Sequence, residues 1–196
     1  MKKSLCALVL IALLMSSCFR IRQNRAVHGS KILTYQINTT GAFNQSAYLG
    51  ATNLVNGLLD QDYDDVIVKK FTISGVNFNI TPNPTNKATS VAMESPYIIG
   101  FKSGTLMREE AFSLSTTANF EVAAFLAFSG VQDINQKITD LLRGLHTDDL
   151  RLSVQGEAVP KGQLASFTLT VKIDYAIEFT HCIDVFIGQQ DAGPPC

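Results

Sequence analysis

The chain has 196 residues, enough for one domain with a sizeable core, and it is 46% hydrophobic and 17% charged. This composition excludes an intrinsically disordered chain, and four cysteines are too few for a small disulfide scaffold. The net charge of −1 combines two unequal parts, because residues 1–59 hold six basic and no acidic residues, whereas residues 60–196 hold 10 basic and 17 acidic ones.

The N-terminus has the layout of a secretory signal peptide. Two lysines follow Met1, and residues 5–15 form an uncharged apolar run that is too short to span a bilayer. The run ends in Leu14-Met15-Ser16-Ser17-Cys18, which resembles the lipobox of bacterial lipoproteins, although Met15 stands where leucine is usual. The resemblance covers residues 1–18 only. It implies removal of residues 1–17, acylation of Cys18 and a location in the cell envelope. Phe19, in place of aspartate, favours the outer membrane, facing the periplasm or the surface. The alternative is an ordinary cleaved signal in which Cys18 has no role.

The mature chain is predicted to have three parts. Residues 18–30 contain the lipidated cysteine and three arginines, and we expect them to be a basic tether beside the membrane. Residues 31–187 are expected to form a single β-rich domain. Residues 188–196 lack periodicity, contain Pro194-Pro195 and are predicted to be a flexible tail.

Alternating apolar residues predict that most of the domain is β-strand. The alternation over residues 70–81 changes phase at Ser74-Gly75, which indicates a bulge. Residues 90–102 and 112–128 predict further strands, the second apolar on both faces and therefore central. Residues 150–155 predict a strand that a hairpin over residues 156–162 joins to residues 167–179. This last strand has seven apolar residues at period two, and its length indicates that it bends, changes sheet or pairs with two partners.

Two segments have the spacing of amphipathic helices, residues 131–146 and, more weakly, residues 45–61. Each is followed by two aspartates and an alternating strand, which indicates an internal duplication unless the match is chance. We therefore predict an α+β, β-dominated fold. It is a largely antiparallel sandwich or open barrel of about ten strands with these two helices.

The sequence contains few candidates for catalytic or metal-binding residues. The sequence has no nucleophile elbow, zinc-protease pair or phosphate-binding loop, and its histidines (His28, His146 and His181) stand apart. We predict no enzyme activity, no catalytic residue and no cofactor. Asp60, Asp62 and Asp64 are weak candidates for a calcium site, and a solvated acidic turn is the favoured interpretation. Cys182 and Cys196 could form a disulfide in an oxidising periplasm, the alternative being a buried Cys182 and a free terminal thiol.

Two functions from different classes remain. The first is a non-enzymatic, lipid-anchored cell-envelope protein that binds or helps to assemble another envelope protein through its strand edges, with no nucleic-acid partner. The alternative is a carrier or sensor of an apolar, lipid-like ligand, because the chain has twelve phenylalanines and no tryptophan. The two differ in where six of these phenylalanines point, since a dry core argues against a carrier and a lined cavity favours one. The six are Phe71, Phe78, Phe120, Phe125, Phe167 and Phe179.

Overall fold

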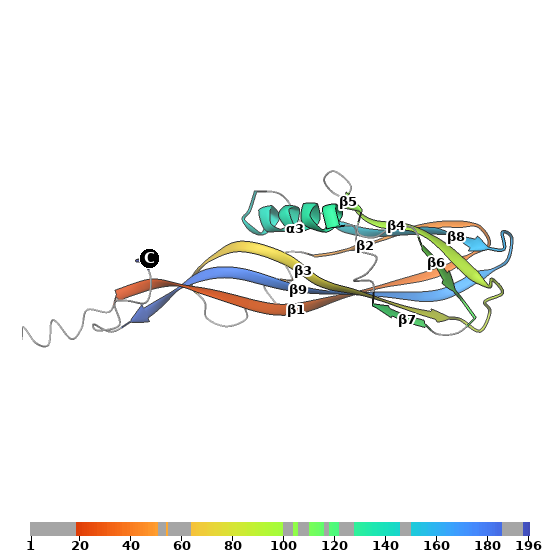
Figure 1. Ribbon diagram of the computed structural model, residues 1–196, viewed down its shortest axis with the longest axis horizontal. Coiled ribbons are helices and arrows are strands. Elements are labelled where there is room, and N and C mark those ends of the chain that lie inside the picture. The colour runs from red at the N-terminus through yellow and green to blue at the C-terminus, as the bar shows by residue number, and fades with distance from the viewer. Residues whose placement is uncertain are drawn as a thin grey trace, which may run out of the picture.

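The computed structural model describes residues 19–50, 54, 64–99, 104–105, 110–115, 118–121, 128–145, 150–185 and 194–196. Within these residues the fold is β-dominated, with nine strands and one helix arranged as two antiparallel sheets (Figure 1). The sheets form a sandwich and not a closed barrel. The predicted β-dominated, antiparallel fold is therefore confirmed, whereas the predicted ten strands and two helices are not matched in detail.

The two sheets have the connectivity of a jelly roll. The first has the order β1-β9-β3-β7, formed by β1 (Phe19–Thr39), β9 (Ala165–Val185), β3 (Asp64–Pro82) and β7 (Ala118–Glu121). The second has the order β2-β8-β4-β5, formed by β2 (Ala42–Tyr48), β8 (Arg151–Val159), β4 (Ser90–Ile99) and β5 (Gly104–Thr105), with β6 (Glu110–Ser113) also paired to β4. The chain changes sheet between β1 and β2, between β3 and β4 and between β8 and β9, as in double-sheet jelly rolls.

Strand β9 links its two neighbours in the first sheet. β9 pairs with β1 along its whole length, from Phe19↔Val185 to Thr39↔Ala165, and with β3 on its other side. This confirms the predicted long strand and its two partners. Its alternating side chains Phe167, Ile177 and Phe179 are fully buried. The predicted bulge is also confirmed, because the register of β3 shifts between Ile73 and Gly75 and leaves Ser74 as the extra residue.

The predicted hairpin between residues 150–155 and 167–179 is wrong. β8 pairs with β2 and β4 in the second sheet, and β9 lies in the first. The two strands therefore pack face to face and their connection crosses the sandwich. Leu152 and Val154 are fully buried there, and Tyr35 of β1 donates a hydrogen bond from its hydroxyl to the carbonyl of Leu152 at 2.8 Å, which ties the two sheets together.

The helix predicted over residues 131–146 is confirmed as α3 (Phe128–Leu142), which buries Ile134, Ile138 and Leu141. The helix predicted over residues 45–61 is wrong at its start, because residues 45–48 belong to β2. Of the remainder only Leu54 is described, in a helical turn with its N–H bonded to the carbonyl of Gly50.

Most of the first copy of the predicted duplication lies outside the described residues, because residues 51–53 and 55–63 are not described. The strands that follow the two segments, β3 and β8, lie in different sheets. The central strand predicted over residues 112–128 is divided among the end of β6, the edge strand β7 and the first residue of α3.

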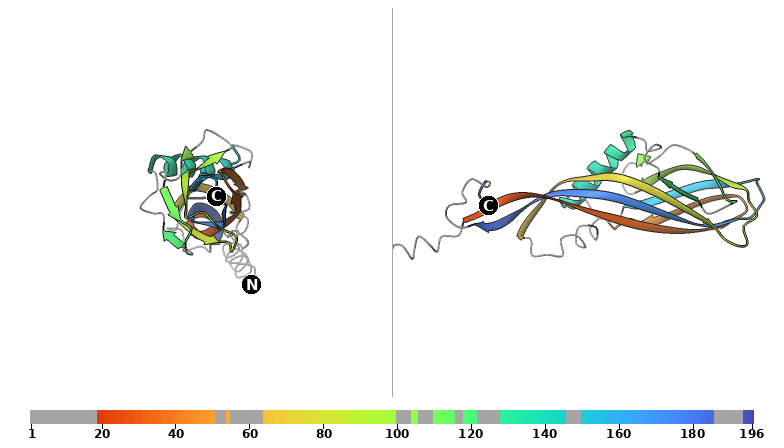
Figure 2. Two further views of the ribbon diagram at one scale, coloured as in Figure 1. Left: turned by 90° about the vertical axis from the view of Figure 1, so that its right-hand side faces the viewer. Right: turned by 60° about the horizontal axis from the view of Figure 1, so that its bottom comes forward.

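The molecule has a head and a stalk. In the head the two sheets face each other, and β1, β9 and β3 then continue beyond the second sheet as a twisted three-stranded extension (Figures 1 and 2). We call residues 19–29, 64–73 and 175–185 the stalk, because Gly29, Tyr175 and Ile73 form one row across the three strands. At roughly 3.3 Å per residue, the part of β1 in the stalk is about 36 Å long.

Candidate functional site

The stalk begins at the first described residue. Phe19 is already paired with Val185, so Arg20, Arg22 and Arg25 lie in a sheet strand. The prediction that residues 18–30 form a tether is therefore wrong for residues 19–30. The physical reason is that β9 and β1 are of equal length, so every residue of the segment has a residue of β9 opposite it, and alternate residues hydrogen-bond to β9.

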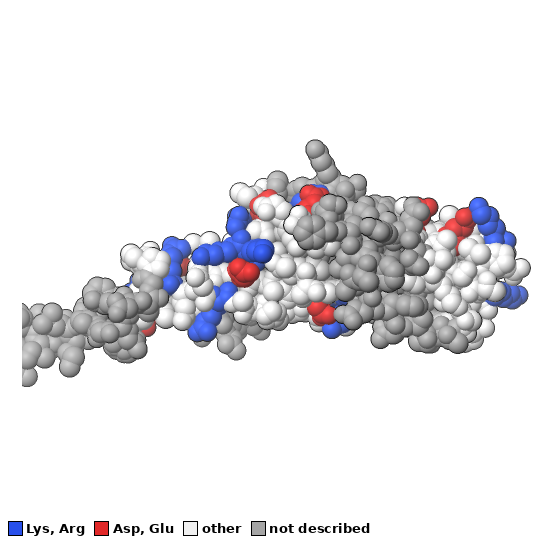
Figure 3. All heavy atoms as spheres, in the orientation of Figure 1, with Lys and Arg blue, Asp and Glu red and all other residues white. Residues whose placement is uncertain are grey.

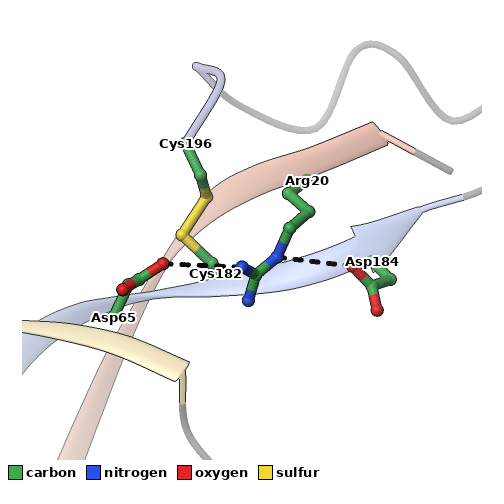
Figure 4. Close-up of a disulfide and its surroundings, with 5 residues drawn as sticks. All are labelled: Arg20, Asp65, Cys182, Asp184 and Cys196. Carbon is green, nitrogen blue, oxygen red and sulfur yellow. Dashed lines mark ion pairs between the residues drawn. A yellow bond between two sulfur atoms is a disulfide. The ribbon is translucent and has the colours of Figure 1, made fainter.

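The C-terminus closes the end of the stalk. Cys196 forms a disulfide with Cys182 of β9, with 6.2 Å between their Cα atoms (Figure 4). The N–H of Arg22 bonds to the carbonyl of Pro194 at 2.8 Å, and the N–H of Cys196 bonds to the carbonyl of Arg20 at 3.1 Å. The predicted flexible tail is therefore wrong for residues 194–196, which pair with β1, and residues 188–193 lie outside the described residues.

Arg20 joins three chain segments at this end. Its guanidinium lies 3.6 Å from a carboxylate oxygen of Asp65 and 3.5 Å from one of Asp184 (Figure 4). All three side chains are largely exposed, so each ion pair contributes at most about 1 kcal/mol. Of the side-chain links at this end, the covalent bridge therefore contributes more than either ion pair.

The hydrogen bonds to the C-terminal residues also show which way the backbone groups of β1 point. The carbonyl of Arg20 and the N–H of Arg22 point away from β9, and in an antiparallel strand the backbone groups of successive residues point to opposite sides. The register with β9 has no shift, and the carbonyl of Gln36 also points outward, where it accepts a bond from the Gln45 amide at 2.8 Å. Even-numbered residues of β1 therefore direct both their N–H and C=O groups to the outer edge.

Between the two covered ends lies an uncovered stretch of this edge. No described residue bonds to the outward backbone groups of the six even-numbered residues from 24 to 34. We call these six residues the open edge: Asn24, Ala26, His28, Ser30, Ile32 and Thr34. Their side chains are all exposed, and Ile32 leaves 59% of its surface in solvent.

The open edge has basic surroundings. Residues 24–34 include Arg25, His28 and Lys31 but no acidic residue. On the adjacent strand β9 the acidic side chains have cations near them, since Asp174 lies 2.8 Å from Lys172 and Glu178 stands opposite Lys70 of β3. Figure 3 shows basic side chains gathered over the stalk.

The opposite edge of the stalk is covered by side chains of α3. Thr139 accepts a hydrogen bond from the N–H of Phe71, and Asn135 accepts one from the N–H of Ile73, both at 2.9 Å. Arg143, just after α3, donates to the carbonyls of Val68 and Lys69. Helical side chains thus replace a partner strand along β3, beyond the point where its pairing with β7 ends.

The interior of the described core is filled. Phe71, Phe78, Phe167 and Phe179 are all buried, and the space enclosed by residues such as Leu49, Ile138 and Tyr175 measures about 10 Å³. Burial raises the pKa of Tyr35 well above its usual range and also raises the pKa of Tyr175. The side chains of Phe120 and Phe125 lie outside the described residues.

The remaining candidates are not brought together. Asp60, Asp62 and His146 lie outside the described residues, and Asp64 begins β3 opposite Cys182. His28 is exposed on the open edge, and His181 is buried beside Phe179. Among the described side chains no three of His, Cys, Asp and Glu are grouped to hold a metal ion. In the described part of the chain, no helix has the length and apolarity needed to cross a membrane.

No protein-family model and no curated protein matches the chain. Its similar solved structures include Desmodium yellow mottle tymovirus (TM-score 0.40, 11% identity, 85% of this chain and 92% of that one covered). Turnip yellow mosaic virus has a TM-score of 0.37 at 9% identity over 85% and 86% of the two chains. The decameric BFDV capsid protein has a TM-score of 0.35 at 9% identity over 79% and 99%. Likeness at this level carries no argument about function.

Proposed function

We propose that the protein is a non-enzymatic, lipid-anchored module of the bacterial cell envelope that binds, or helps to assemble, another envelope protein. The observation that carries this proposal is the start of β1 at Phe19, one residue after the candidate lipidation site Cys18. A lipid on Cys18 would therefore be joined to the sheet almost directly, with one residue between the anchor and Arg20.

In this arrangement the stalk would act as a rigid spacer between the lipid and the head. Three paired strands are far stiffer than a single chain, and the stalk portion of β1 spans about 36 Å. The head would therefore be presented at a set distance from the outer membrane, on its periplasmic or surface side. The bridge from Cys182 to Cys196 attaches the C-terminal residues, which pair with β1, to β9 at the end nearest the lipid.

Within the described core, the packing favours the binding module over the carrier. An apolar ligand needs a lined cavity of a few hundred Å³. The space enclosed near Tyr175 measures about 10 Å³, and four of the six phenylalanines singled out in the sequence are described and buried in the interior.

Metabolic labelling with radioactive palmitate tests the proposal. The full-length protein is expected to incorporate label and to sediment with membranes, and Cys18→Ser is expected to lose both properties. Cys6→Ser is the matched control, because residue 6 lies in the segment that the proposal has cleaved off. Retention of label and membrane association by Cys18→Ser would overturn the proposal.

A further inference from the structure

We propose that the open edge of β1 is the docking site for an extended, acidic segment of another protein, which adds to the β1-β9-β3-β7 sheet as a further strand. This inference rests on the proposed function, because it assigns the surface and the partner chemistry of the binding module.

The backbone supplies the main attraction. Asn24, Ala26, His28, Ser30, Ile32 and Thr34 direct N–H and C=O groups outward in one continuous row, which is the template that strand addition uses. The row spans eleven residues of β1, whereas the whole of β2 has 7 residues and β7 has 4. It is therefore the longest edge that the described part of the chain offers to a partner.

The chain itself covers the edge of β1 on both sides of the open edge. Residues 194–196 occupy the edge beside Arg20 and Arg22, and the Gln45 side chain occupies it at Gln36. The opposite edge of the sheet is covered by α3 along the stalk. Other stretches of sheet edge are thus covered, whereas no described residue covers this one. This difference is expected if the open edge binds a partner.

Charge selects the partner. Residues 24–34, which contain the open edge, include Arg25, His28 and Lys31 but no acidic residue. The carboxylates on β9 lie near basic side chains. An acidic segment gains from this field, while a basic one is repelled. Ile32, 59% exposed, adds one apolar contact near the head.

A second copy of the chain fits this charge pattern poorly. Antiparallel pairing of two β1 edges around Gly29 would set Lys31 opposite Val27 of the other copy, and therefore diagonal to its Arg25. Such diagonal neighbours lie about 7–8 Å apart, so the seam would collect like charges from both chains. We therefore assign the edge to a different, acidic protein.

Site-specific photocrosslinking in the cells that carry the protein tests the assignment. A photoreactive amino acid replaces Ser30 in the full-length protein, and a matched probe replaces Thr170 on the outer face of β9. We expect an adduct with another protein from position 30 and at least tenfold less from position 170. The crosslinked peptide, mapped by mass spectrometry, should have a net negative charge.

Two pairs of variants distinguish the contribution of backbone hydrogen bonds from that of charge. Ala26→Pro removes an outward N–H without touching the β9 ladder, and Ala26→Ser retains it. Lys31→Glu reverses a charge, and Lys31→Arg preserves it. We expect Ala26→Pro and Lys31→Glu each to reduce the adduct at least tenfold and the two controls to leave it within twofold.

Several outcomes would overturn the assignment: no adduct above the position-170 background, an adduct with a second copy, a crosslinked peptide that is not acidic, or an adduct insensitive to both Ala26→Pro and Lys31→Glu. Palmitate labelling in the same cells reports the anchor separately. Label without an adduct refutes the open edge as a docking site, whereas an adduct without label refutes the anchor and leaves the docking site in place.

Discussion

The head and the stalk share strands β1, β9 and β3 but cover the inner faces of these strands differently. In the head, the second sheet covers the inner face, and Phe167 is completely buried. In the stalk, Phe71 and Phe179 are buried to the same extent, and α3 lies along β3, where its side chains accept hydrogen bonds from the β3 backbone. A disulfide and exposed ion pairs add to the backbone pairing of the strands at the far end of the stalk. Both parts therefore have a buried apolar face, and the open edge of β1 runs from the stalk, at Asn24, into the head, at Thr34.

The largest expected effect comes from opening a cavity in the head. Phe167 is fully buried and its ring lies 6.0 Å from that of Phe43, edge to face. Phe167→Ala should lower the free energy of unfolding by about 3–5 kcal/mol in urea titrations. Ile67→Ala is the exposed control, because it removes a side chain that is 45% exposed and should cost less than about 1 kcal/mol. Equal losses from the two variants would contradict the assignment of Phe167 to a filled core.

The next effect comes from the bridge at the stalk end. Cys182 and Cys196 are separated by 14 positions, and closing a loop of that size stabilises a protein by about 3 kcal/mol. Cys196→Ser should remove this contribution and speed amide exchange at Arg22, while amides of the head keep their protection. Thiol titration of the unreduced, unfolded domain is the direct check, because two reactive thiols in that assay would mean that no bridge forms.

A smaller loss of stability is expected when a hydrogen bond between α3 and the edge of β3 is removed. Thr139→Val keeps the shape of the side chain but leaves the buried N–H of Phe71 without its acceptor, at a cost of about 1–3 kcal/mol. Thr139→Ser retains the hydroxyl and should lose less. Amide exchange at Phe71 measures the contact directly, and unchanged protection in Thr139→Val would show that the hydroxyl does not hold this edge.

Alkaline pH should weaken the head through Tyr35. Burial raises the pKa of this phenol in the folded state, so the unfolded chain releases the proton first. Stability is therefore retained below about pH 10 and falls by up to about 1.4 kcal/mol per pH unit above it. Tyr35→Phe should lose part of this alkaline slope, measured by urea unfolding between neutral pH and pH 11. An unchanged slope would mean that Tyr35 does not contribute to it.

The parts of the fold that the sequence predicts well are those where one face is fully buried. β9 shows uninterrupted alternation because its inner face is covered along most of its length. β1 has the same length, but Gln23, Arg25 and Lys31 stand among its inward positions where the covering is thin. The sequence pattern therefore predicts a tether for this strand, although its odd-numbered apolar residues are the signal of a buried strand face: Ile21, Val27, Leu33, Tyr35 and Ile37.

Other features depend on long-range contacts that local patterns do not record. Two alternating strands joined by a short turn form either a hairpin or a crossing between sheets, and the sequence around Pro160 is compatible with both. The weak helical spacing over residues 45–61 includes Tyr48, which pairs with Arg151 at the end of β2. The open edge is likewise defined by what does not pair with it, so only the assembled sheet reveals it.

Amide hydrogen exchange along β1, resolved residue by residue by NMR on the isolated domain, tests the central claim most directly. The odd-numbered amides from 25 to 33 bond to β9 and should exchange slowly, while the even-numbered amides from 24 to 34 point to the outer edge and should exchange at least tenfold faster. Uniformly slow exchange across residues 24–34 would contradict the account, because the edge would then already be occupied.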